Sequence, residues 1–277
     1  MRVAVAQLDP KLGERERNLE TCLQRFEEAV AAGAQLLVLP ECAVPGYMFE
    51  SLEEGLAHAE EVPGPTTEAF EEACARLDAY VICGTLQRDG DLLRNAAVFV
   101  GPEGPIGTYW KTHLPFLGVD RFTTSGDELP VWDTPLGRVG VEICYDLRFP
   151  EVTRTLALKG ADLVAHPTNF PMAAKVQTEL ITVARAAENR IYLLTANRVG
   201  MERRGEFCGW SQIVDPYGKR LAEAGETEEA LLVADVEVEK ARDKDYVIPG
   251  EYELYLFGHR RPELYCALVE EQRAVEA

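Results

Sequence analysis

Short apolar runs of strand length alternate with amphipathic helical stretches along most of the chain, and this alternation is the strongest constraint on its fold. The runs lie at 2–8, 35–39, 80–85, 95–100, 107–110, 139–143, 162–166, 191–197, 209–214 and 230–236. Apolar residues recur at helical spacing around 19–30, 67–77, 150–158 and 176–187. Without a linker or low-complexity run, this pattern predicts one α/β domain whose sheets are covered by helices. The last two runs, separated by the turn Asp215-Pro216-Tyr217-Gly218, are expected to form a hairpin.

The charge of the chain argues against two classes of partner. With 28 Lys and Arg against 47 Asp and Glu, the net charge is −19, which repels nucleic-acid phosphates and anionic lipids. The apolar runs are far shorter than the roughly 20 residues of a membrane span, and the N-terminus does not resemble a signal peptide. We therefore expect a cytoplasmic protein that acts on a small molecule, with no nucleic-acid or membrane partner.

The cysteines and histidines do not follow a metal-binding pattern. The seven cysteines are an odd number and lack the close pairing of a zinc knuckle, and the four histidines are scattered. We expect most of the cysteines to be reduced core residues, and we expect neither a metal nor another cofactor.

Three polar residues each follow an apolar run: Glu41 after LLVLP, Lys111 after GTYW and Cys144 after VGVEI. Ligands in α/β sheets collect outside the carboxyl ends of strands, so three such ends can converge on one pocket. Taken singly, the glutamate and the lysine are also typical of solvated loops, and the cysteine is typical of a core position. Placement alone leaves both interpretations open.

Together, these three side chains supply what acyl transfer requires. A thiol is a useful nucleophile only as a thiolate or beside a base that takes its proton. A carboxylate whose pKa is raised by burial can be that base, and an ammonium can stabilise the oxyanion of a tetrahedral intermediate. The residues therefore favour a cysteine hydrolase that uses no catalytic histidine.

The segments around the three residues resemble the nitrilase superfamily of carbon–nitrogen hydrolases. The matching stretches are LLVLPECAVPGY, GTYWKTHLP, VGVEICYDLRFPE, ARAAENRIYLLTANRVG and the opening VAVAQLDP. The resemblance implies a four-layer αββα sandwich that assembles into homodimers or larger homo-oligomers. It also implies Glu41 as general base, Lys111 as the group that stabilises the oxyanion, and Cys144 as the nucleophile that forms a thioester.

The resemblance implies supporting roles for neighbouring residues. The backbone N–H of Tyr145 becomes a second oxyanion donor, and His113 braces the Lys111 loop. Many members carry a second glutamate after the lysine, but THLPFLGVDRFTTSGD contains none. Asp120 is the nearest substitute, and an ordinary surface turn is the alternative explanation for it.

Three further residues are candidates for lining the substrate pocket. Asn169 and Phe170 follow the apolar run at 162–166, and Phe116 lies in the Lys111 loop. A polar loop with buried aromatic residues would explain them equally well. Arg148 suits a substrate carboxylate or an ion pair with a neighbouring acid, so it does not identify the substrate.

The residues after the nucleophile bear on the substrate. Members that hydrolyse nitriles typically have Trp and then Glu there, whereas this chain has Tyr145 and Asp146. The resemblance therefore implies a small linear amide, with an N-carbamoyl amino acid or amine as the alternative and a nitrile less favoured. An acyltransferase, a catalytically silent binding protein and a redox-sensing thiol protein are the other hypotheses.

The C-terminal stretch differs in character from the rest of the chain. We expect one hydrolase domain over residues 1–277, in which about 242–277 form an extension. This extension is rich in Tyr, Glu and Arg and shows weak periodicity, so it is either a candidate for a subunit interface or a loose tail.

Overall fold

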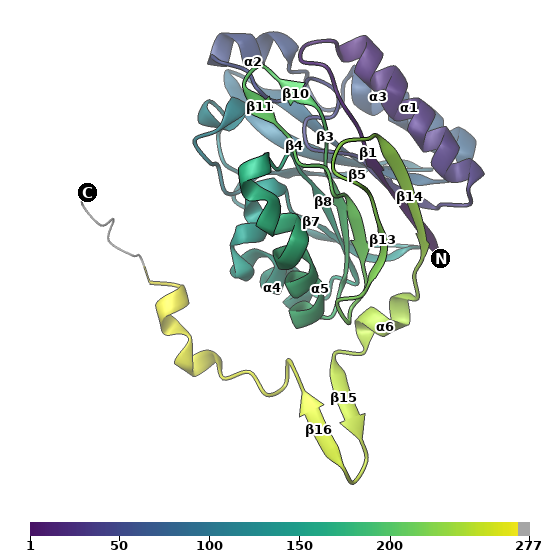
Figure 1. The fold of residues 1–277 in the computed structure, drawn as a ribbon, viewed down its shortest axis with the longest axis vertical. Coiled ribbons are helices and arrows are strands. Elements are labelled where there is room, and N and C mark those ends of the chain that lie inside the picture. The colour runs from purple at the N-terminus through teal and green to yellow at the C-terminus, as the bar shows by residue number, and fades with distance from the viewer. Residues whose placement is uncertain (271–277) are drawn as a thin grey trace. The chain divides into compact units, whose positions relative to one another are not determined.

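The computed structural model describes residues 1–270, and the chain divides into a unit that ends at Arg242 and a second that begins at Asp243. The first unit is built on two six-stranded sheets (Figure 1). The first sheet has the order β14-β1-β2-β3-β4-β5 and contains β1 (Arg2–Gln7), β2 (Leu36–Val38), β3 (Tyr80–Asp89), β4 (Leu92–Gly101), β5 (Gly104–Trp110) and β14 (Ala230–Asp235). The second has the order β13-β12-β9-β8-β7-β6 and contains β6 (Val131–Thr134), β7 (Gly137–Val141), β8 (Leu163–Pro167), β9 (Tyr192–Ala196), β12 (Gln212–Val214) and β13 (Arg220–Glu223).

Helices cover the outer face of each sheet, and the inner faces pack together. Helices α1 (Arg15–Ala31) and α3 (Pro65–Leu77) lie on the first sheet, where the rings of Phe26 and Phe70 meet edge to face in its core. Helices α4 (Pro150–Leu158) and α5 (Thr182–Asn189) lie on the second, and Leu156 packs on Gly140 of β7. Strand β1 contacts β9, and β2 contacts β8. The layers therefore run α, β, β, α, which confirms the predicted sandwich (Figure 1).

The strand directions bring three segment ends to the site. Strands β1, β2 and β3 are parallel, and so are β7, β8 and β9. Strand β5 runs in the direction of β3, because two antiparallel pairings separate them. Glu41 after β2 and Lys111 after β5 therefore leave the first sheet at the same edge, and Cys144 follows β7 of the second sheet.

The predicted hairpin between 209–214 and 230–236 is wrong. Strand β12 instead pairs with β13, which begins soon after the predicted turn, while β14 crosses to the first sheet and pairs antiparallel with β1. Leu231 and Val233 of β14 pack on the core beneath α1 and α3. The strand thus gains apolar burial in the first sheet, and β13 already holds the place beside β12.

The second unit contains a small hairpin of its own. Strands β15 (Asp245–Ile248) and β16 (Tyr252–Tyr255) pair antiparallel, and two 3₁₀ turns follow, η5 (Pro262–Leu264) and η6 (Cys266–Leu268). Of the predicted extension at 242–277, residues 271–277 lie outside the described residues. Within residues 1–270, no helix has both the length and the apolarity needed to span a bilayer.

Candidate active site

Cys144 lies at a sharp turn where strand β7 gives way to the 3₁₀ helix η2 (Cys144–Arg148). Its backbone φ of +48° lies in the left-handed region, which residues other than glycine rarely adopt. Backbone strain of this kind is concentrated at functional sites. The residue is buried, and the Nε2 atom of His166 donates to its carbonyl oxygen at 3.3 Å. Burial raises the pKa of the Cys144 thiol, and the negative charge of Glu41 raises this pKa further. The resting thiol is therefore protonated and needs a base to become a nucleophile.

Glu41 is such a carboxylate, and it is completely buried. Burial raises the pKa of Glu41, while the Lys111 ammonium opposes this rise. Atom Oε1 accepts from Nζ of Lys111 at 2.6 Å and from Nδ2 of Asn95 at 2.7 Å. Atom Oε2 has no hydrogen-bond partner among the described residues. One carboxylate oxygen is thus held by the protein, and the other is free to accept a proton.

Lys111 places a buried positive charge between two carboxylates. Its Nζ atom lies 2.6 Å from Oε1 of Glu41 and 2.6 Å from Oδ2 of Asp120, and all three side chains are shielded from solvent. Burial alone lowers the pKa of Lys111, but the two carboxylates outweigh burial and raise this pKa well above its usual range. Lys111 therefore remains an ammonium, the form that can stabilise an oxyanion.

Asp120 lies on the 3₁₀ helix η1 (Gly118–Arg121) and is buried rather than on a surface turn. Besides Lys111, its carboxylate accepts hydrogen bonds from the hydroxyl of Tyr47 at 2.8 Å and from Nδ2 of Asn95 at 2.8 Å. Two buried donors and an ammonium thus surround this carboxylate. The structure places Asp120 beside Glu41 and Lys111, where it can act as the supporting carboxylate that the sequence analysis considered.

Asp146 joins the Lys111 segment to the Cys144 turn. One carboxylate oxygen accepts from the backbone N–H of Ile143 at 2.9 Å and from the Tyr109 hydroxyl at 2.8 Å. The other accepts from the backbone N–H of His113 at 2.9 Å and lies 2.9 Å from Nδ1 of the same residue. His113, in the loop after Lys111, is therefore linked to the Cys144 turn through Asp146, and its ring stacks on Phe149.

The remaining predicted residues fall in different places. Asn169 is buried, and its Nδ2 donates to the Glu41 carbonyl at 2.9 Å. Phe170 is also buried, and the centroid of its ring lies 5.5 Å from the centroid of the His166 ring. Phe116 is 90% exposed, so the structure does not bring it into the buried cluster. Tyr145 is the second residue of η2, next to Cys144.

Sequence reasoning missed Asn95, Tyr47 and the bridging role of Asp146. Asn95 is a polar residue in the otherwise apolar stretch that ends β4, and it is buried. A buried amide in a strand needs partners, so this position was a signal that could have been used. Tyr47 offered no such signal, because a tyrosine in a loop after a glutamate is compatible with many roles.

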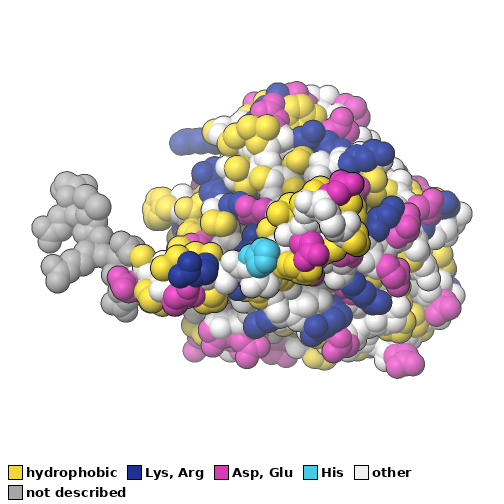
Figure 2. Space-filling view, turned by 90° about the horizontal axis from the view of Figure 1, so that it is seen from below, with side chains coloured by type: hydrophobic (Ala, Val, Ile, Leu, Met, Phe, Trp, Pro, Cys, Tyr) yellow, Lys and Arg dark blue, Asp and Glu magenta, His cyan; other side chains and the backbone are white. Residues whose placement is uncertain are grey.

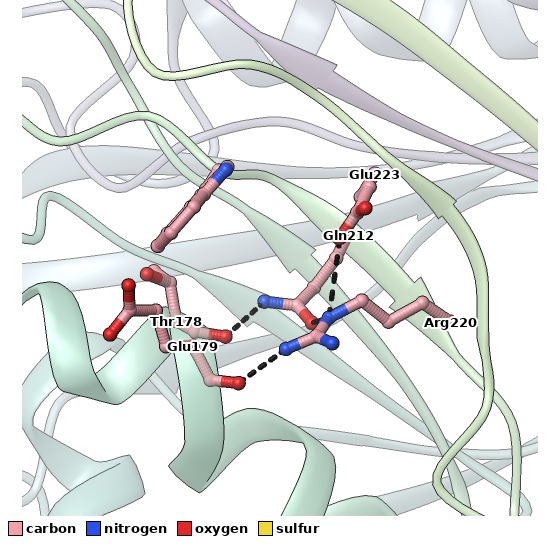
Figure 3. Close-up of a pocket in the computed structure, with 6 residues that line it drawn as sticks. Thr178, Glu179, Gln212, Arg220 and Glu223 are labelled. Atoms are coloured by element: carbon pink, nitrogen blue, oxygen red, sulfur yellow. Dashed lines mark hydrogen bonds and ion pairs between the residues drawn. The ribbon is translucent and has the colours of Figure 1, made fainter.

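A separate cavity of about 250 Å³ lies between the segment before α5 and strands β12 and β13 (Figure 3). Its polar groups already bind one another: Gln212 donates to the carbonyl of Thr178, and Arg220 donates to Gln212. The same guanidinium also contacts Glu223 and the carbonyl of Glu179. The residues lining this cavity do not include Glu41, Lys111, Asp120 or Cys144. Among the residues that the structure describes, no group of three or more His, Cys, Asp or Glu is arranged to hold a metal.

The fold and site together define an αββα protein in which a buried carboxylate and a buried ammonium are in contact at strand ends, and both act electrostatically on a buried cysteine at a third strand end. The sequence model described as carbon-nitrogen hydrolase matches residues 2–246. A nitrilase of Pyrococcus abyssi is 42% identical over 96% of this chain and 99% of its own length. The human omega-amidase NIT2 is 30% identical over 90% of this chain and 91% of its own length.

Solved structures give the same result. An amidase of Nesterenkonia sp. AN1, with acrylamide added at its active-site cysteine, has a TM-score of 0.80 and 25% identity, covering 97% of this chain and 100% of that one. The chain therefore belongs to the carbon–nitrogen hydrolase family, within the nitrilase superfamily. It is an enzyme that hydrolyses carbon–nitrogen bonds.

Proposed function

We propose that the protein hydrolyses a small linear amide through a thioester on Cys144. The observation that carries this proposal is the buried cluster in which Lys111 lies 2.6 Å from Oε1 of Glu41, while Oε2 has no partner among the described residues. An ammonium for the oxyanion and a free carboxylate oxygen for the proton are the two groups that an attacking thiol requires.

In the first half-reaction, Oε2 of Glu41 takes the thiol proton as the Cys144 sulfur attacks the amide carbon. Lys111 and the backbone N–H of Tyr145 stabilise the negative oxygen of the tetrahedral intermediate. When the carbon–nitrogen bond breaks, Glu41 returns the proton to the leaving nitrogen, which departs as ammonia. The product left on the enzyme is the Cys144 thioester.

In the second half-reaction, water replaces the thiol as nucleophile. Glu41 takes a proton from the attacking water, and the second tetrahedral intermediate uses the same oxyanion donors. Collapse of this intermediate expels the Cys144 sulfur, which regains its proton from Glu41. One amide and one water thus give one carboxylic acid and one ammonia. Asn169, whose side chain binds the Glu41 carbonyl, and the buried Phe170 are proposed to line the substrate pocket.

The names of relatives bear on the choice of substrate. The NIT2 proteins are omega-amidases and the Nesterenkonia protein is an amidase, which supports an amide, whereas the Pyrococcus relative is called a nitrilase. Tyr145 and Asp146 after the nucleophile support the amide over the nitrile. An N-carbamoyl substrate is the second candidate, because the same attack on a carbamoyl carbon would also release ammonia or an amine.

A substrate panel with detection of the acyl-enzyme tests this proposal. Short amides, N-carbamoyl amino acids and nitriles are incubated with the enzyme, ammonia is measured, and the mass of the peptide containing Cys144 is recorded. We expect ammonia and an acyl adduct with amides, and neither with Cys144→Ala. Cys208→Ala, which changes another buried free cysteine, is the matched control and should keep activity. Transfer of the acyl group to added hydroxylamine but not to water would instead support an acyltransferase.

We also propose that the enzyme is a homo-oligomer in which the second unit contributes to the interface. The large apolar side chains Tyr246, Val247, Ile248, Tyr252 and Leu254 of the hairpin are exposed. Figure 2 shows further hydrophobic side chains on the segment that leads to the grey residues. A two-stranded hairpin is marginally stable in water by itself, which favours a partner for this surface. Light scattering tests this by comparing the molar mass of the wild-type chain with that of the double variant Val247→Glu, Leu254→Glu. We expect a lower mass for the double variant, and an equal mass would contradict the proposal.

A reducing compartment such as the cytoplasm is proposed for the enzyme. All seven cysteines are free thiols, and six of them are buried. Protein disulfides are rare in the cytoplasm, so this cysteine usage fits that compartment. Localisation of a tagged chain in its native cell tests the proposal.

A further inference from the structure

The side chain of Asn95 bridges the two carboxylates that hold Lys111. Asn95 is a buried residue of β4, and its Nδ2 donates to Oε1 of Glu41 at 2.7 Å and to Oδ1 of Asp120 at 2.8 Å. Lys111 bridges the same two carboxylates at 2.6 Å each. The four side chains therefore form a closed ring in which an amide and an ammonium alternate with two carboxylates.

The backbone of Asn95 binds Lys111 as well. The backbone N–H of Lys111 donates to the carbonyl oxygen of Asn95 at 2.9 Å. One residue thus fixes the main chain of Lys111 and also fixes both partners of its ammonium. A shift of Asn95 would move the two ends of Lys111 together.

The orientation of the amide is also determined by its surroundings. The Cys42 thiol donates to Oδ1 of Asn95 at 3.8 Å between sulfur and oxygen, which leaves the Nδ2 hydrogens for the two carboxylates. A flipped amide would place its carbonyl oxygen against both carboxylates and lose two charge-assisted hydrogen bonds. The structure therefore supports a single orientation.

We infer that Asn95 is a positioning residue that holds Oε1 of Glu41 against Lys111 and thereby leaves Oε2 as the proton acceptor for Cys144. This inference rests on the proposed function of Glu41 as the base. Without the amide, the Glu41 carboxylate has one donor fewer, and its rotation about the last side-chain bond is restrained by Lys111 alone. Either change reduces the fraction of molecules in which Oε2 is ready to take the thiol proton.

The hydrogen bond from Asn95 also sets the direction in which substitutions of Asn95 shift the pKa of Glu41. The hydrogen bond from Asn95 favours the ionised form of Glu41 and lowers the pKa of this carboxyl, against the rise caused by burial. Removing the donor raises the pKa of Glu41, and replacing it with a third carboxyl group raises this pKa further. The acidic limb of the kcat/KM profile must then move to higher pH, since the base has to be ionised to act.

The test compares Asn95→Leu, which has similar size but no donor, with Asn95→Asp, which has the same shape but acidic character. We expect kcat to fall about 10- to 100-fold in both, as for other groups that orient a catalytic residue, with a smaller change in KM. The acidic limb should lie lowest in the wild type, higher in Asn95→Leu and highest in Asn95→Asp. An unshifted limb with kcat within about twofold of the wild type in Asn95→Leu would overturn the inference.

A matched control separates this effect from simple loss of packing. Asn18 is another buried asparagine whose Nδ2 donates twice, to the carbonyls of Lys11 and Val44, but it lies outside the ring. Asn18→Leu should lower the melting temperature without moving the pH limb, and a limb shift of equal size in Asn18→Leu would refute a specific role for Asn95. If Asn95→Leu does not fold, Asn95→Asp and Asn95→Ser carry the test. The limb must then lie higher in the aspartate variant than in the serine variant, which keeps one hydroxyl donor.

The experiment also distinguishes failure of the inference from failure of the proposed function. A wild-type enzyme that forms no Cys144 acyl adduct with any amide contradicts the proposed function. A wild-type enzyme that forms the adduct, beside an Asn95→Leu variant with unchanged rate and pH limb, contradicts only the role of Asn95.

Discussion

Atom Oδ2 of Asp120 lies 2.6 Å from Nζ of Lys111, and neither side chain is exposed to solvent. Removing one member of a buried ion pair leaves an uncompensated charge in a medium of low polarity, and the usual cost is about 3–5 kcal/mol. Glu41 still contacts Lys111 after the change, so the lower end of this range applies. Asp120 therefore supports the Lys111 ammonium together with Glu41.

Asp120→Ala is predicted to lower both stability and turnover. The free energy of unfolding should fall by about 3 kcal/mol, and kcat should fall about 10- to 100-fold, because Lys111 loses a partner that orients it. Urea unfolding and steady-state kinetics on a short amide measure the two effects. Asp127→Ala, an exposed residue of the same loop, is the control and should change neither quantity. Unchanged turnover in Asp120→Ala would remove the residue from the site.

Asp146→Asn is predicted to weaken the link between the loop after Lys111 and the turn at Cys144. The carboxylate accepts from Ile143 and Tyr109 on one oxygen and from His113 on the other. An amide has one oxygen, so its NH₂ group would face donors on one side and leave them unsatisfied. We expect a loss of about 2–4 kcal/mol in the free energy of unfolding, together with a lower kcat.

The acid dependence of this link has a definite sign. Burial opposes ionisation of Asp146, but its donors outweigh burial and lower the pKa of this carboxyl below its usual value of 3.8. Its contribution to stability is therefore complete above about pH 4 and is lost as the pH falls further. Thermal unfolding from pH 3 to 7 should show a steeper acid loss for the wild type than for Asp146→Asn. Asp133→Asn, on an exposed strand position, is the control and should follow the wild-type curve.

The strand-end positions of the candidate site residues were easier to predict from the sequence than the connections between strands. Glu41, Lys111 and Cys144 stand directly after apolar runs, and the ends of such runs are visible without knowing which strands pair. Pairing depends on contacts between distant segments, which is why β14 was assigned to the wrong partner. The amide of Asn95 could be recognised as a buried polar group, but its partners lie 54 and 25 positions away and require the folded sheet.

The arrangement of the loop after Lys111 also could not be predicted from the sequence. This loop has no periodicity in sequence, yet η1 turns the chain so that Asp120 faces the interior while Phe116 is exposed. The hydroxyl of Tyr47, from the loop after Glu41, donates to the Asp120 carboxylate at 2.8 Å and helps to hold it in the interior. A contact of this kind leaves no local pattern, so the family resemblance could suggest Asp120 but could not place it.

Glu142→Gln is predicted to make the protein more stable in mild alkali. Glu142 is completely buried, and burial raises its pKa to about 8 from the usual value of 4.5. The folded state then holds a proton that the unfolded state loses. Its contribution to stability is complete below about pH 4.5, declines as pH rises and is lost above about pH 8. A neutral glutamine still accepts the hydrogen bond from Thr153 and removes this dependence.

Denaturant unfolding at pH 5, 7 and 8.5 measures the effect. The gain for Glu142→Gln should be small at pH 5 and on the order of a few kcal/mol at pH 8.5. Glu151→Gln, an exposed residue in the first turn of α4, is the matched control and should show little gain at any pH. Equal stability of wild type and Glu142→Gln at pH 8.5 would show that the carboxyl is not held neutral.

Arg198 and Glu202 are predicted to separate stability from activity in a double-mutant cycle. The Arg198 guanidinium is fully buried and contacts Oε1 of Glu202, whose other oxygen accepts from the backbone N–H of Tyr47 at 2.9 Å and of Met48 at 3.0 Å. Glu202→Leu alone should be strongly destabilising, by about 3 kcal/mol, because it leaves the buried Arg198 guanidinium with only the more distant carboxylate of Asp9, 3.6 Å away. Adding Arg198→Met should recover a large part of that loss, since two apolar side chains can replace a buried ion pair.

Turnover should not recover with stability. In the double variant, the backbone N–H groups of Tyr47 and Met48 still lack their acceptor, so the loop that presents the Tyr47 hydroxyl to Asp120 loses its anchor. We expect kcat to remain about tenfold or more below the wild type, measured at a temperature where the double variant is fully folded. The exposed pair Glu14 and Arg17, changed to Leu and Met, should affect neither quantity, because solvent screens such contacts. A double variant with wild-type kcat would show that the Arg198–Glu202 pair serves the fold alone, because Glu202 is linked to Lys111 through the Tyr47 backbone, the Tyr47 hydroxyl and Asp120.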